Sequence, residues 1–356
     1  MTTDLVVIKL DAARQALIEA KTIQETKKVL DVAHAAEIYA KRQQLGEEAI
    51  RYATEIKVEA LAQLGRMLRE TPRARPAVGS QVIGTERVPM KDTERATLSD
   101  LGLDKKTSKL AQDIASLPDD QFEKVKSGVF TLAQAAQEAR HQRLAEDRNR
   151  LATQGSTIED TEQWQVWQAD IETWQAPCQY DFIITDPPYP REYLHLYEVL
   201  ARRAAEWLKP EGLLIAMCGQ SYLAAIHLAL GTHLNYYWTA CYLTPGQPTP
   251  LRHRQVNTSW KPLLIYSRQE YKGKIFGDVF TSNKPDKDHH EWGQSVSGMY
   301  HIISQMCLPG QNILDPFCGA GTTGVAALQH GCLFAGIDIS QENVDITRAR
   351  LGKGHD

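Results

Sequence analysis

The stretch NILDPFCGAGTT (residues 312–323) decides the fold of the second half of the chain. An apolar run ends in an acidic residue, two glycines follow, and the next residues have the pattern of a helix. Gly319 and Gly321 let the backbone approach a ligand closely, and a helix N-terminus favours an anion such as a carboxylate. This order predicts a ligand-binding loop at the carboxyl end of a parallel sheet.

A second acidic position points to the class of ligand. Asp338 lies near the end of the next apolar run, LFAGIDI (333–339), where nucleoside-binding α/β folds place a carboxylate on the ribose hydroxyls. The glycine-rich loop has no lysine of the kind that binds phosphate. The pattern therefore favours a nucleoside that carries an amino acid over a nucleotide.

Strands and helices alternate through the rest of this half. The expected strands are 164–170, 180–186, 212–219, 236–243, 260–267, 311–316 and 333–339, and the expected helices are roughly 192–208, 221–230, 295–307, 322–330 and 341–351. Short apolar strands that alternate with helices predict an α/β fold whose mostly parallel sheet is covered on both faces.

The tetrapeptide Asp186-Pro187-Pro188-Tyr189 follows one of these strands, YDFIITD. A chance match in a chain of this length is on the order of one in a thousand from average residue usage. A rigid turn would also explain two prolines, but the carboxyl end of a strand is where open α/β sheets place their chemistry. The motif resembles the signature of amino-methyltransferases that act on planar exocyclic NH2 groups.

The residue types fit that chemistry. An adenine or cytosine amine donates its lone pair into the ring and is a poor nucleophile. The Asp186 carboxylate and the Pro187 carbonyl can each accept one N–H and so favour a tetrahedral nitrogen. The prolines fix φ and hold that carbonyl in place, and Tyr189 offers a face on which an extruded base can stack.

Composition divides the chain near residue 150. The first 150 residues carry 25 Lys and Arg against 23 Asp and Glu, whereas the remainder carries 15 against 21. All six cysteines and all seven tryptophans follow residue 150. No apolar run of 18 residues and no basic leader is present, so neither a spanning helix nor a signal peptide is expected. A cytoplasmic chain with free thiols is the expectation.

The first half has a helical composition. We expect a helical hairpin over 1–72, a linker over 73–92 and a helical region over 93–155, followed by the catalytic domain over 156–356. Thr22 and Glu25 fit a capping box that opens a helix ending near Gln44. The apolar stripe of the hairpin needs a partner, which is either the other domain or a second copy in a homodimer.

The segment after Thr93 has the outline of a helix-turn-helix, with a tight turn at Leu101-Gly102 and a second helix from about Asp104. Lys105, Lys106 and Lys109 would then face DNA. An ordinary helical hairpin with a solvated lysine face fits equally well. The following helices weakly resemble those of ParB-type DNA-binding domains.

Together the two motifs resemble the S-adenosylmethionine-dependent DNA amino-methyltransferases of the N6-adenine/N4-cytosine type, in the permuted arrangement called the β class. The resemblance covers about residues 160–356. It implies a Rossmann-like methyltransferase fold, in which WKPLLIYS (260–267) is the antiparallel hairpin strand.

The resemblance also implies the site residues. The catalytic positions would be Asp186, Pro187, Pro188 and Tyr189, and those holding S-adenosylmethionine would be Asp170, Asp315, Phe317, Gly319, Gly321, Thr322, Thr323, Asp338 and Ile339. The chain departs from the family's His…Lys-Pro stretch, so Gln294 and Ser295 are carried over only as cofactor neighbours.

A second departure concerns DNA recognition. Only residues 269–288 lie where the family places a target-recognition region, too few for a domain. The loop 244–259, with Arg252, His253 and Arg254, and the N-terminal helices are the alternatives.

The expected function is adenine-N6 methylation of double-stranded DNA, because Asp at the start of the motif leans toward adenine in this family. Cytosine-N4 methylation, a DNA-binding regulator with an idle methyltransferase fold, and methylation of RNA or protein glutamine are the alternatives. We expect a cytoplasmic, DNA-associated protein of bacterial or phage origin, without a metal site.

Overall fold

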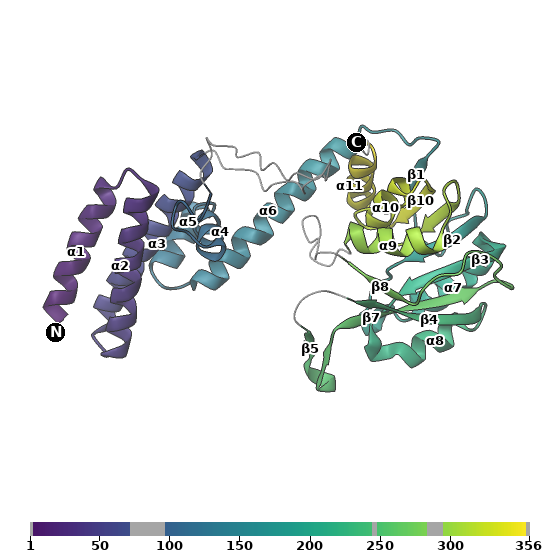
Figure 1. The fold of residues 1–356 in the computed structure, drawn as a ribbon, viewed down its shortest axis with the longest axis horizontal. Coiled ribbons are helices and arrows are strands. Elements are labelled where there is room, and N and C mark those ends of the chain that lie inside the picture. The colour runs from purple at the N-terminus through teal and green to yellow at the C-terminus, as the bar shows by residue number, and fades with distance from the viewer. Residues whose placement is uncertain (1–2, 72–96, 244–247, 283–294, 354–356) are drawn as a thin grey trace, which may run out of the picture. The chain divides into compact units, whose positions relative to one another are not determined.

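The computed structural model describes residues 3–71, 97–243, 248–282 and 295–353. The chain forms two compact units, residues 1–143 and 144–356 (Figure 1). The division falls inside a helix, between Arg143 and Leu144, whereas the sequence placed the start of the catalytic domain at 156. The expected linker 73–92 lies outside the described residues.

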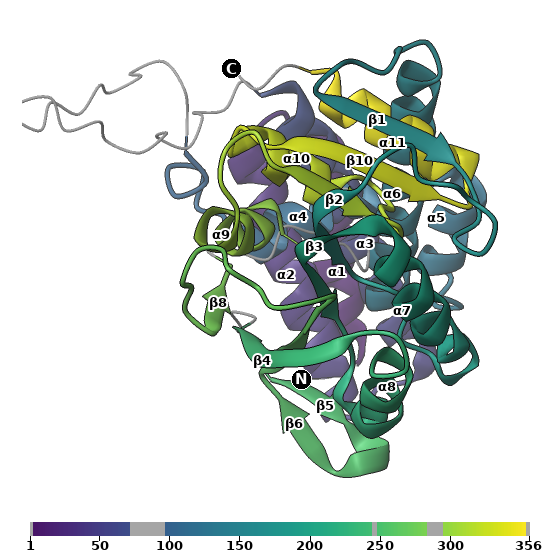
Figure 2. The same cartoon turned by 90° about the vertical axis from the view of Figure 1, so that its right-hand side faces the viewer.

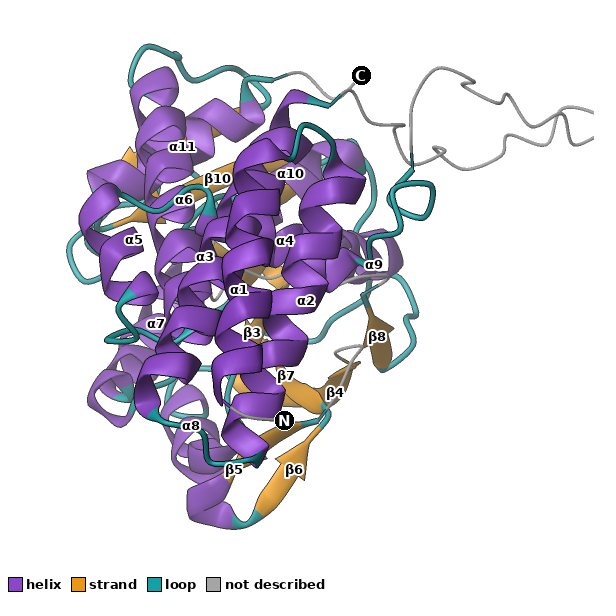
Figure 3. Cartoon of the chain, turned by 90° about the vertical axis from the view of Figure 1, so that its left-hand side faces the viewer, coloured by secondary structure: helices purple, strands orange, loops and turns teal. Residues whose placement is uncertain are grey.

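The first unit contains helices and turns among its described residues (Figure 3). It begins with α1 (Thr3–Glu19), α2 (Ile23–Arg42) and α3 (Glu47–Glu70). The expected two-helix hairpin is thus a three-helix arrangement, because α1 packs on both α2 and α3 and covers their apolar side with Leu10 and Leu17. The Thr22–Glu25 capping box is present at the start of α2.

Three shorter or later helices complete this unit: α4 (Lys105–Ile114), α5 (Asp119–Lys126) and the first part of α6 (Leu132–Gly155). Residues 98–102 form hydrogen-bonded turns, and Gly102 has a φ of +66°, which ends them before Asp104 caps α4. Of the expected helix-turn-helix, the structure contains the turn and the second helix; residues 93–96 lie outside the described residues.

The second unit is built on an eight-stranded sheet with the strand order β1-β10-β9-β2-β3-β7-β4-β8. The strands are β1 (Trp164–Gln168), β2 (Tyr180–Thr185), β3 (Leu208–Met217), β4 (Asn235–Leu243), β7 (Trp260–Ser267), β8 (Val279–Thr281), β9 (Asn312–Asp315) and β10 (Leu333–Asp338). Only β7 runs against its neighbours in this sheet, so the carboxyl ends of the other strands share one edge.

Helices cover both faces of the sheet (Figure 2). One core contains residues of α9 (Val296–Met306), α10 (Thr322–Gln329) and α11 (Gln341–Leu351), and the other contains residues of α7 (His195–Trp207) and α8 (Leu223–Leu230). Alternate residues of β2 explain the two cores, because Phe182 and Ile184 point into the first and Ile183 into the second. The predicted fold class is confirmed.

Two short strands, β5 (Thr249–Leu251) and β6 (Val256–Thr258), form an antiparallel hairpin that projects from the sheet between β4 and β7 (Figure 1). The one-turn helices η1 (Arg191–Tyr193), η2 (Gln220–Tyr222) and η3 (Arg252–Arg254) lie in connections. No helix among the described residues combines the length and the apolar character that crossing a membrane requires.

The last turns of α6 belong to the second unit because they pack on α11. Arg148 donates hydrogen bonds to Glu342 at 2.9 Å and to Asn343 at 3.0 Å, and Leu151 is buried against Ile346. Gly155 lies so close to α11 that an added Cβ would sit 1.7 Å from the Asp345 carbonyl oxygen.

We therefore expect Gly155→Ala to lower the free energy of unfolding of the second unit by about 1–3 kcal/mol, the usual cost of overpacking. Thermal unfolding of this variant is to be compared with that of Gly277→Ala, because an added Cβ at Gly277 meets no described atom within 4 Å. Equal melting temperatures for the two variants would contradict the close packing of α6 on α11.

Candidate active site

A buried carboxylate joins the glycine-rich loop to the neighbouring strand. Asp315, the last residue of β9, is 3% exposed. Its Oδ1 accepts hydrogen bonds from Thr185 Oγ1 at 2.6 Å and from the Phe317 amide at 3.1 Å, and its Oδ2 accepts one from Thr323 Oγ1 at 2.6 Å. These bonds fix the end of β2, the loop and the first turn of α10 to one another.

Burial raises the pKa of Asp315 to about 6, while the bonds from Thr185, Thr323 and the Phe317 amide oppose this rise. The negative charge of Asp186 also raises the Asp315 pKa, so the two motifs lie within electrostatic reach of each other. The sequence had identified both carboxylates but not Thr185, which carries no motif signal of its own.

The glycine-rich loop has the backbone that its glycines predict. Gly319 and Gly321 have φ values of +52° and +76°, a region that favours glycine. A Cβ added at Gly319 would meet no described atom nearer than the Phe317 carbonyl oxygen at 4.0 Å, so this side of the loop is open to a ligand. At Gly321 the same atom would lie 2.7 Å from Thr347 Cγ2, which leaves room for hydrogen alone.

Two further carboxylates, Asp338 and Asp170, lie at the carboxyl ends of β10 and of its neighbour β1. Asp338 pairs with Gln168 in the sheet register. Exposed Asp170 lies only two residues after Gln168, so the two carboxylates are at the same edge of the sheet. Asp338 accepts hydrogen bonds from the amides of Gly319 at 2.9 Å and Ser340 at 2.9 Å, and from Asn343 Nδ2 at 3.0 Å. These bonds orient the carboxylate at the edge of the glycine loop.

The expected cofactor residues fall together at this edge. Ile339 is 72% exposed beside half-buried Asp338, so its side chain is accessible to a ligand. Phe317 and Thr322 are half-buried in the loop, and Ser295 caps α9. Gln294 lies outside the described residues.

The DPPY residues lie directly after β2, next to this loop. The Tyr189 hydroxyl donates a short hydrogen bond to Asp186 Oδ1. Burial and the nearby Asp186 charge raise the pKa of Tyr189 well above its usual value, so the phenol remains a proton donor at neutral pH. Pro187 is buried and Pro188 half-buried, as a fixed turn requires.

Two buried groups lie behind the motif. Tyr197 of α7 is fully buried, and its hydroxyl has no hydrogen-bond partner among the described residues. Burial raises the pKa of Cys218 to about 12, and the Asp186 charge adds to that rise, so the thiol is protonated and unsuited to act as a nucleophile.

The hairpin β5–β6 begins and ends at the same edge of the sheet as DPPY, because β4 ends there and the antiparallel β7 begins there. Gln220, just after β3, donates to Thr258 at 3.3 Å and to the Trp260 carbonyl at 3.0 Å. Arg252 and Arg254 are exposed, and Arg254 also donates to the Ser221 carbonyl at 3.0 Å. His253 lies in η3, between the two arginines.

The lysines predicted for DNA contact lie in the other unit. Lys105, Lys106 and Lys109 are all exposed on α4, at its first turns. No group of His, Cys, Asp and Glu residues in the described ranges has the arrangement of a metal site.

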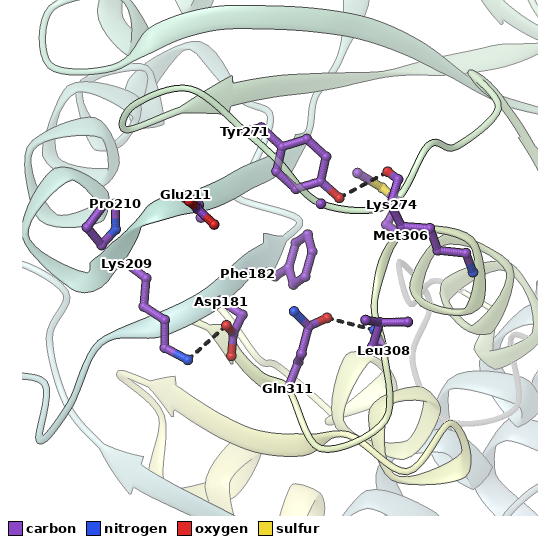
Figure 4. A pocket seen from close by; sticks show the side chains of 12 residues that line it. Asp181, Phe182, Lys209, Pro210, Glu211, Tyr271, Lys274, Met306, Leu308 and Gln311 are labelled. Atoms are coloured by element: carbon purple, nitrogen blue, oxygen red, sulfur yellow. Dashed lines mark hydrogen bonds and ion pairs between the residues drawn. The ribbon is translucent and has the colours of Figure 1, made fainter.

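A cavity of about 340 Å³ lies at the opposite end of the parallel strands (Figure 4). Phe182 and Tyr271 line it, together with the Lys209–Asp181 ion pair at 2.8 Å. Asp181 is the second residue of β2 whereas DPPY follows its last residue, and none of the motif residues lines the cavity. Its location therefore separates it from the chemistry of the two motifs.

Comparisons with known proteins agree with the motifs. Residues 266–349 match the family model described as DNA methylase of the N6/N4 type. The putative methylase YubD of Escherichia coli K12 is 26% identical over 182 residues, which cover 46% of this chain and 77% of YubD. The type II methyltransferase M2.LlaDCHI of Lactococcus lactis is 37% identical over 87 residues, which cover 23% of this chain and 32% of that protein.

Among solved structures, that of the M1.HpyAVI–SAM complex is 26% identical, covers 53% of this chain and 98% of its own, and superposes with a TM-score of 0.46. The motifs and the family match indicate that the second unit is similar to DNA methyltransferases of the N6-adenine/N4-cytosine type. The cofactor that the resemblance of the two motifs implies is S-adenosylmethionine. The open side of Gly319, exposed Ile339 and the oriented Asp338 fit such a cofactor.

The raised pKa of Asp315 predicts a pH dependence. The folded chain holds this proton up to a pH of about 6, whereas the unfolded chain releases it near 3.8. Because the folded state binds more protons between these values, this group's contribution to stability falls as the pH rises through that window.

We therefore expect the melting temperature of the wild type minus that of Asp315→Asn to decrease between about pH 4 and pH 6.5. Thermal unfolding of both proteins over this range measures the difference, and other carboxylates cancel because they are common to both. A difference that grows with pH would contradict the assignment.

Proposed function

We propose that the chain is a DNA adenine-N6 methyltransferase. The observation that supports it best is the placement of Asp186 and Tyr189 at the end of β2, next to the Asp315-anchored glycine loop at the end of β9. One buried hydrogen bond, from Thr185 to Asp315, thereby holds the proposed acceptor of the target amine's hydrogens beside the proposed cofactor loop. The leading Asp of the motif favours adenine over cytosine.

In this proposal Asp186 and the Pro187 carbonyl each accept one hydrogen of the target amine. Holding both N–H bonds out of the ring plane localises the nitrogen lone pair, which raises its nucleophilicity. Pro187 and Pro188 fix the backbone that presents the carbonyl. The target base must leave the duplex to reach these groups, and Tyr189 offers the surface on which it stacks.

S-adenosylmethionine, when bound, supplies an electrophilic methyl group. The chain's own contribution is orientation: Asp338 would hold the ribose hydroxyls, Ile339 would pack on the adenine, and Asp170 would accept from the adenine amine. The glycine loop with Phe317, Thr322 and Thr323 would surround the methionine part, while Ser295 and Gln294 are proposed neighbours. Asp315 acts by fixing the loop, since its oxygens already bind Thr185, Phe317 and Thr323.

Two substitutions separate catalysis from cofactor binding. Asp186→Asn should lower methyl transfer from labelled S-adenosylmethionine to duplex DNA by at least 100-fold, with cofactor affinity within about threefold of the wild type. Asp338→Asn is the matched control, and it should weaken cofactor binding in calorimetry. Loss of cofactor affinity in Asp186→Asn would contradict the role given to Asp186.

Digestion of the labelled DNA to nucleosides identifies the base. N6-methyl-2′-deoxyadenosine supports the proposal, whereas N4-methyl-2′-deoxycytidine would show that the target base is cytosine. No label in DNA would leave the DNA-binding regulator, and label in RNA or protein would point to the remaining alternatives.

DNA contact is proposed for two regions, the hairpin Arg252, His253 and Arg254 and the α4 lysines Lys105, Lys106 and Lys109. The paired arginines share an edge with DPPY, and a two-stranded ribbon fits the major groove. The lysines are exposed at the start of a capped helix, as phosphate contacts require. A homodimer through α1 and α2 is a further proposal, supported by four exposed aliphatic side chains there: Ile8, Ile18, Val32 and Ile38.

We expect Arg252→Ala/Arg254→Ala to reduce discrimination between target and unrelated duplexes, because the hairpin that carries them begins and ends at the same edge of the sheet as the proposed base site. The triple change Lys105→Ala/Lys106→Ala/Lys109→Ala should instead weaken binding to both duplexes and lower the slope of log K against log salt by up to about three. Fluorescence anisotropy over a salt series measures both effects. Unchanged affinity in the triple variant would favour the solvated hairpin for α4.

A further inference from the structure

Lys261 is a cation at the mouth of the proposed base site that no motif identified. It is the second residue of β7 and pairs with Tyr242 of β4 in the sheet register. Its Nζ lies over the Tyr189 ring, 5.1 Å from the centroid, within the range of a cation–π interaction. The side chain of Lys261 therefore covers the aromatic surface on which we propose that the target base stacks.

The Gly219 side of the same ring has little free space. An added Cβ on Gly219 would lie 3.7 Å from Tyr189 carbons, an ordinary contact distance, so there is room for about one methyl group between this backbone and the ring. A stacked base needs carbon–carbon distances of about 3.5–4.0 Å across the whole ring. These distances are shorter than that from the Lys261 ammonium to the Tyr189 ring. A base that stacks on the face covered by Lys261 must therefore displace that side chain.

The charge of Lys261 has no described counterion. Among the ion pairs and hydrogen bonds of the described residues, Lys261 forms none, although it is only half-exposed. The nearby carboxylate of Asp186 accepts a hydrogen bond from the Tyr189 hydroxyl instead. A half-exposed lysine with no counterion among the described residues provides a site for an anion of the substrate.

We propose that Lys261 is a positioning residue that binds a phosphate flanking the target nucleotide once the base has displaced it from Tyr189. This inference rests on the proposed function. Phosphate is favoured over a base edge because a flexible lysine is a strongly hydrated point charge, and most such contacts to DNA go to the backbone. The movement of Lys261 would then couple stacking of the target base on Tyr189 to binding of the DNA phosphate that flanks this base.

The test uses the full chain and a duplex whose methylated base has been mapped with labelled S-adenosylmethionine. Lys261→Met removes the charge and keeps most of the length, and Lys261→Arg restores the charge. We expect Lys261→Met to weaken duplex binding by about tenfold or more and to lower the salt slope by about one, with Lys261→Arg close to wild type. Lys272→Met is the matched control, since Lys272 is an exposed lysine of the same unit.

A second arm replaces the phosphates flanking the target nucleotide, one at a time, by neutral methylphosphonate. The wild type should lose about tenfold in affinity at one of these positions, whereas Lys261→Met should lose no more than about twofold there. Melting temperature and cofactor affinity of the variants should match the wild type, because Lys261 is proposed to contact neither the core nor the cofactor.

Equal losses of the wild type and Lys261→Met on every methylphosphonate duplex would overturn the phosphate contact. A Lys261→Met variant with wild-type DNA affinity and a reduced kcat would also overturn it, and would assign Lys261 to the chemical step. If the wild type transfers no label to DNA, the proposed function fails and the Lys261 proposal fails with it. A wild type that labels DNA while the phosphate effects are independent of Lys261 loses only the latter proposal.

Discussion

One buried carboxylate, Asp315, holds the two motifs in register. It accepts from Thr185 at the end of β2 and from Thr323 in the first turn of α10, so three elements meet at a single charged group. Burial of that charge opposes folding at neutral pH, and the hydrogen bonds offset part of the penalty. A neutral residue would avoid the penalty, but it would not accept three donors at once. The buried carboxylate therefore lowers the stability of the fold, but it fixes the glycine-rich loop relative to the proposed base site.

In the proposed function, selection of the base and attraction to DNA depend on different parts of the chain. The DPPY edge is organised by local contacts, such as the Tyr189 bond to Asp186 and the position of Lys261 over the Tyr189 ring. The exposed cations proposed to contact DNA lie on the β5–β6 hairpin and on α4. Since the half of the chain that contains the sheet has an excess of six acidic groups, binding to a polyanion depends on such local clusters.

Much of the fold follows from the sequence because its signals are local. The apolar runs predicted β7 and α11 with the observed bounds, and the capping box at Thr22 is present. The sequence predicted only the hairpin of α2 and α3. It did not predict that α1 would complete a three-helix arrangement, because α1 acquires that role only by packing on α2 and α3. The short strands β5, β6 and β8 carry too few residues for a period to be recognised.

The site divides in the same way. The glycines and carboxylates of the two motifs can be read from spacing, and their observed backbone angles and hydrogen bonds agree with that reading. Thr185 and Lys261 could not be found, because each acts across the sheet on a residue distant in sequence. Gly155 likewise has a helical sequence context, and its requirement for hydrogen arises only from contact with α11.

The strand order has a consequence for how the protein is made. β9 lies between β2 and β10, yet it is synthesised after every other strand of the sheet except β10. During translation the growing chain therefore presents the edge of β2 unpaired while most of the sheet has already left the ribosome, and such an edge invites misassociation. The glycine-rich loop and the closure of that edge arrive in the same segment, so the edge of β2 is protected at the same stage of synthesis at which the proposed cofactor site is completed.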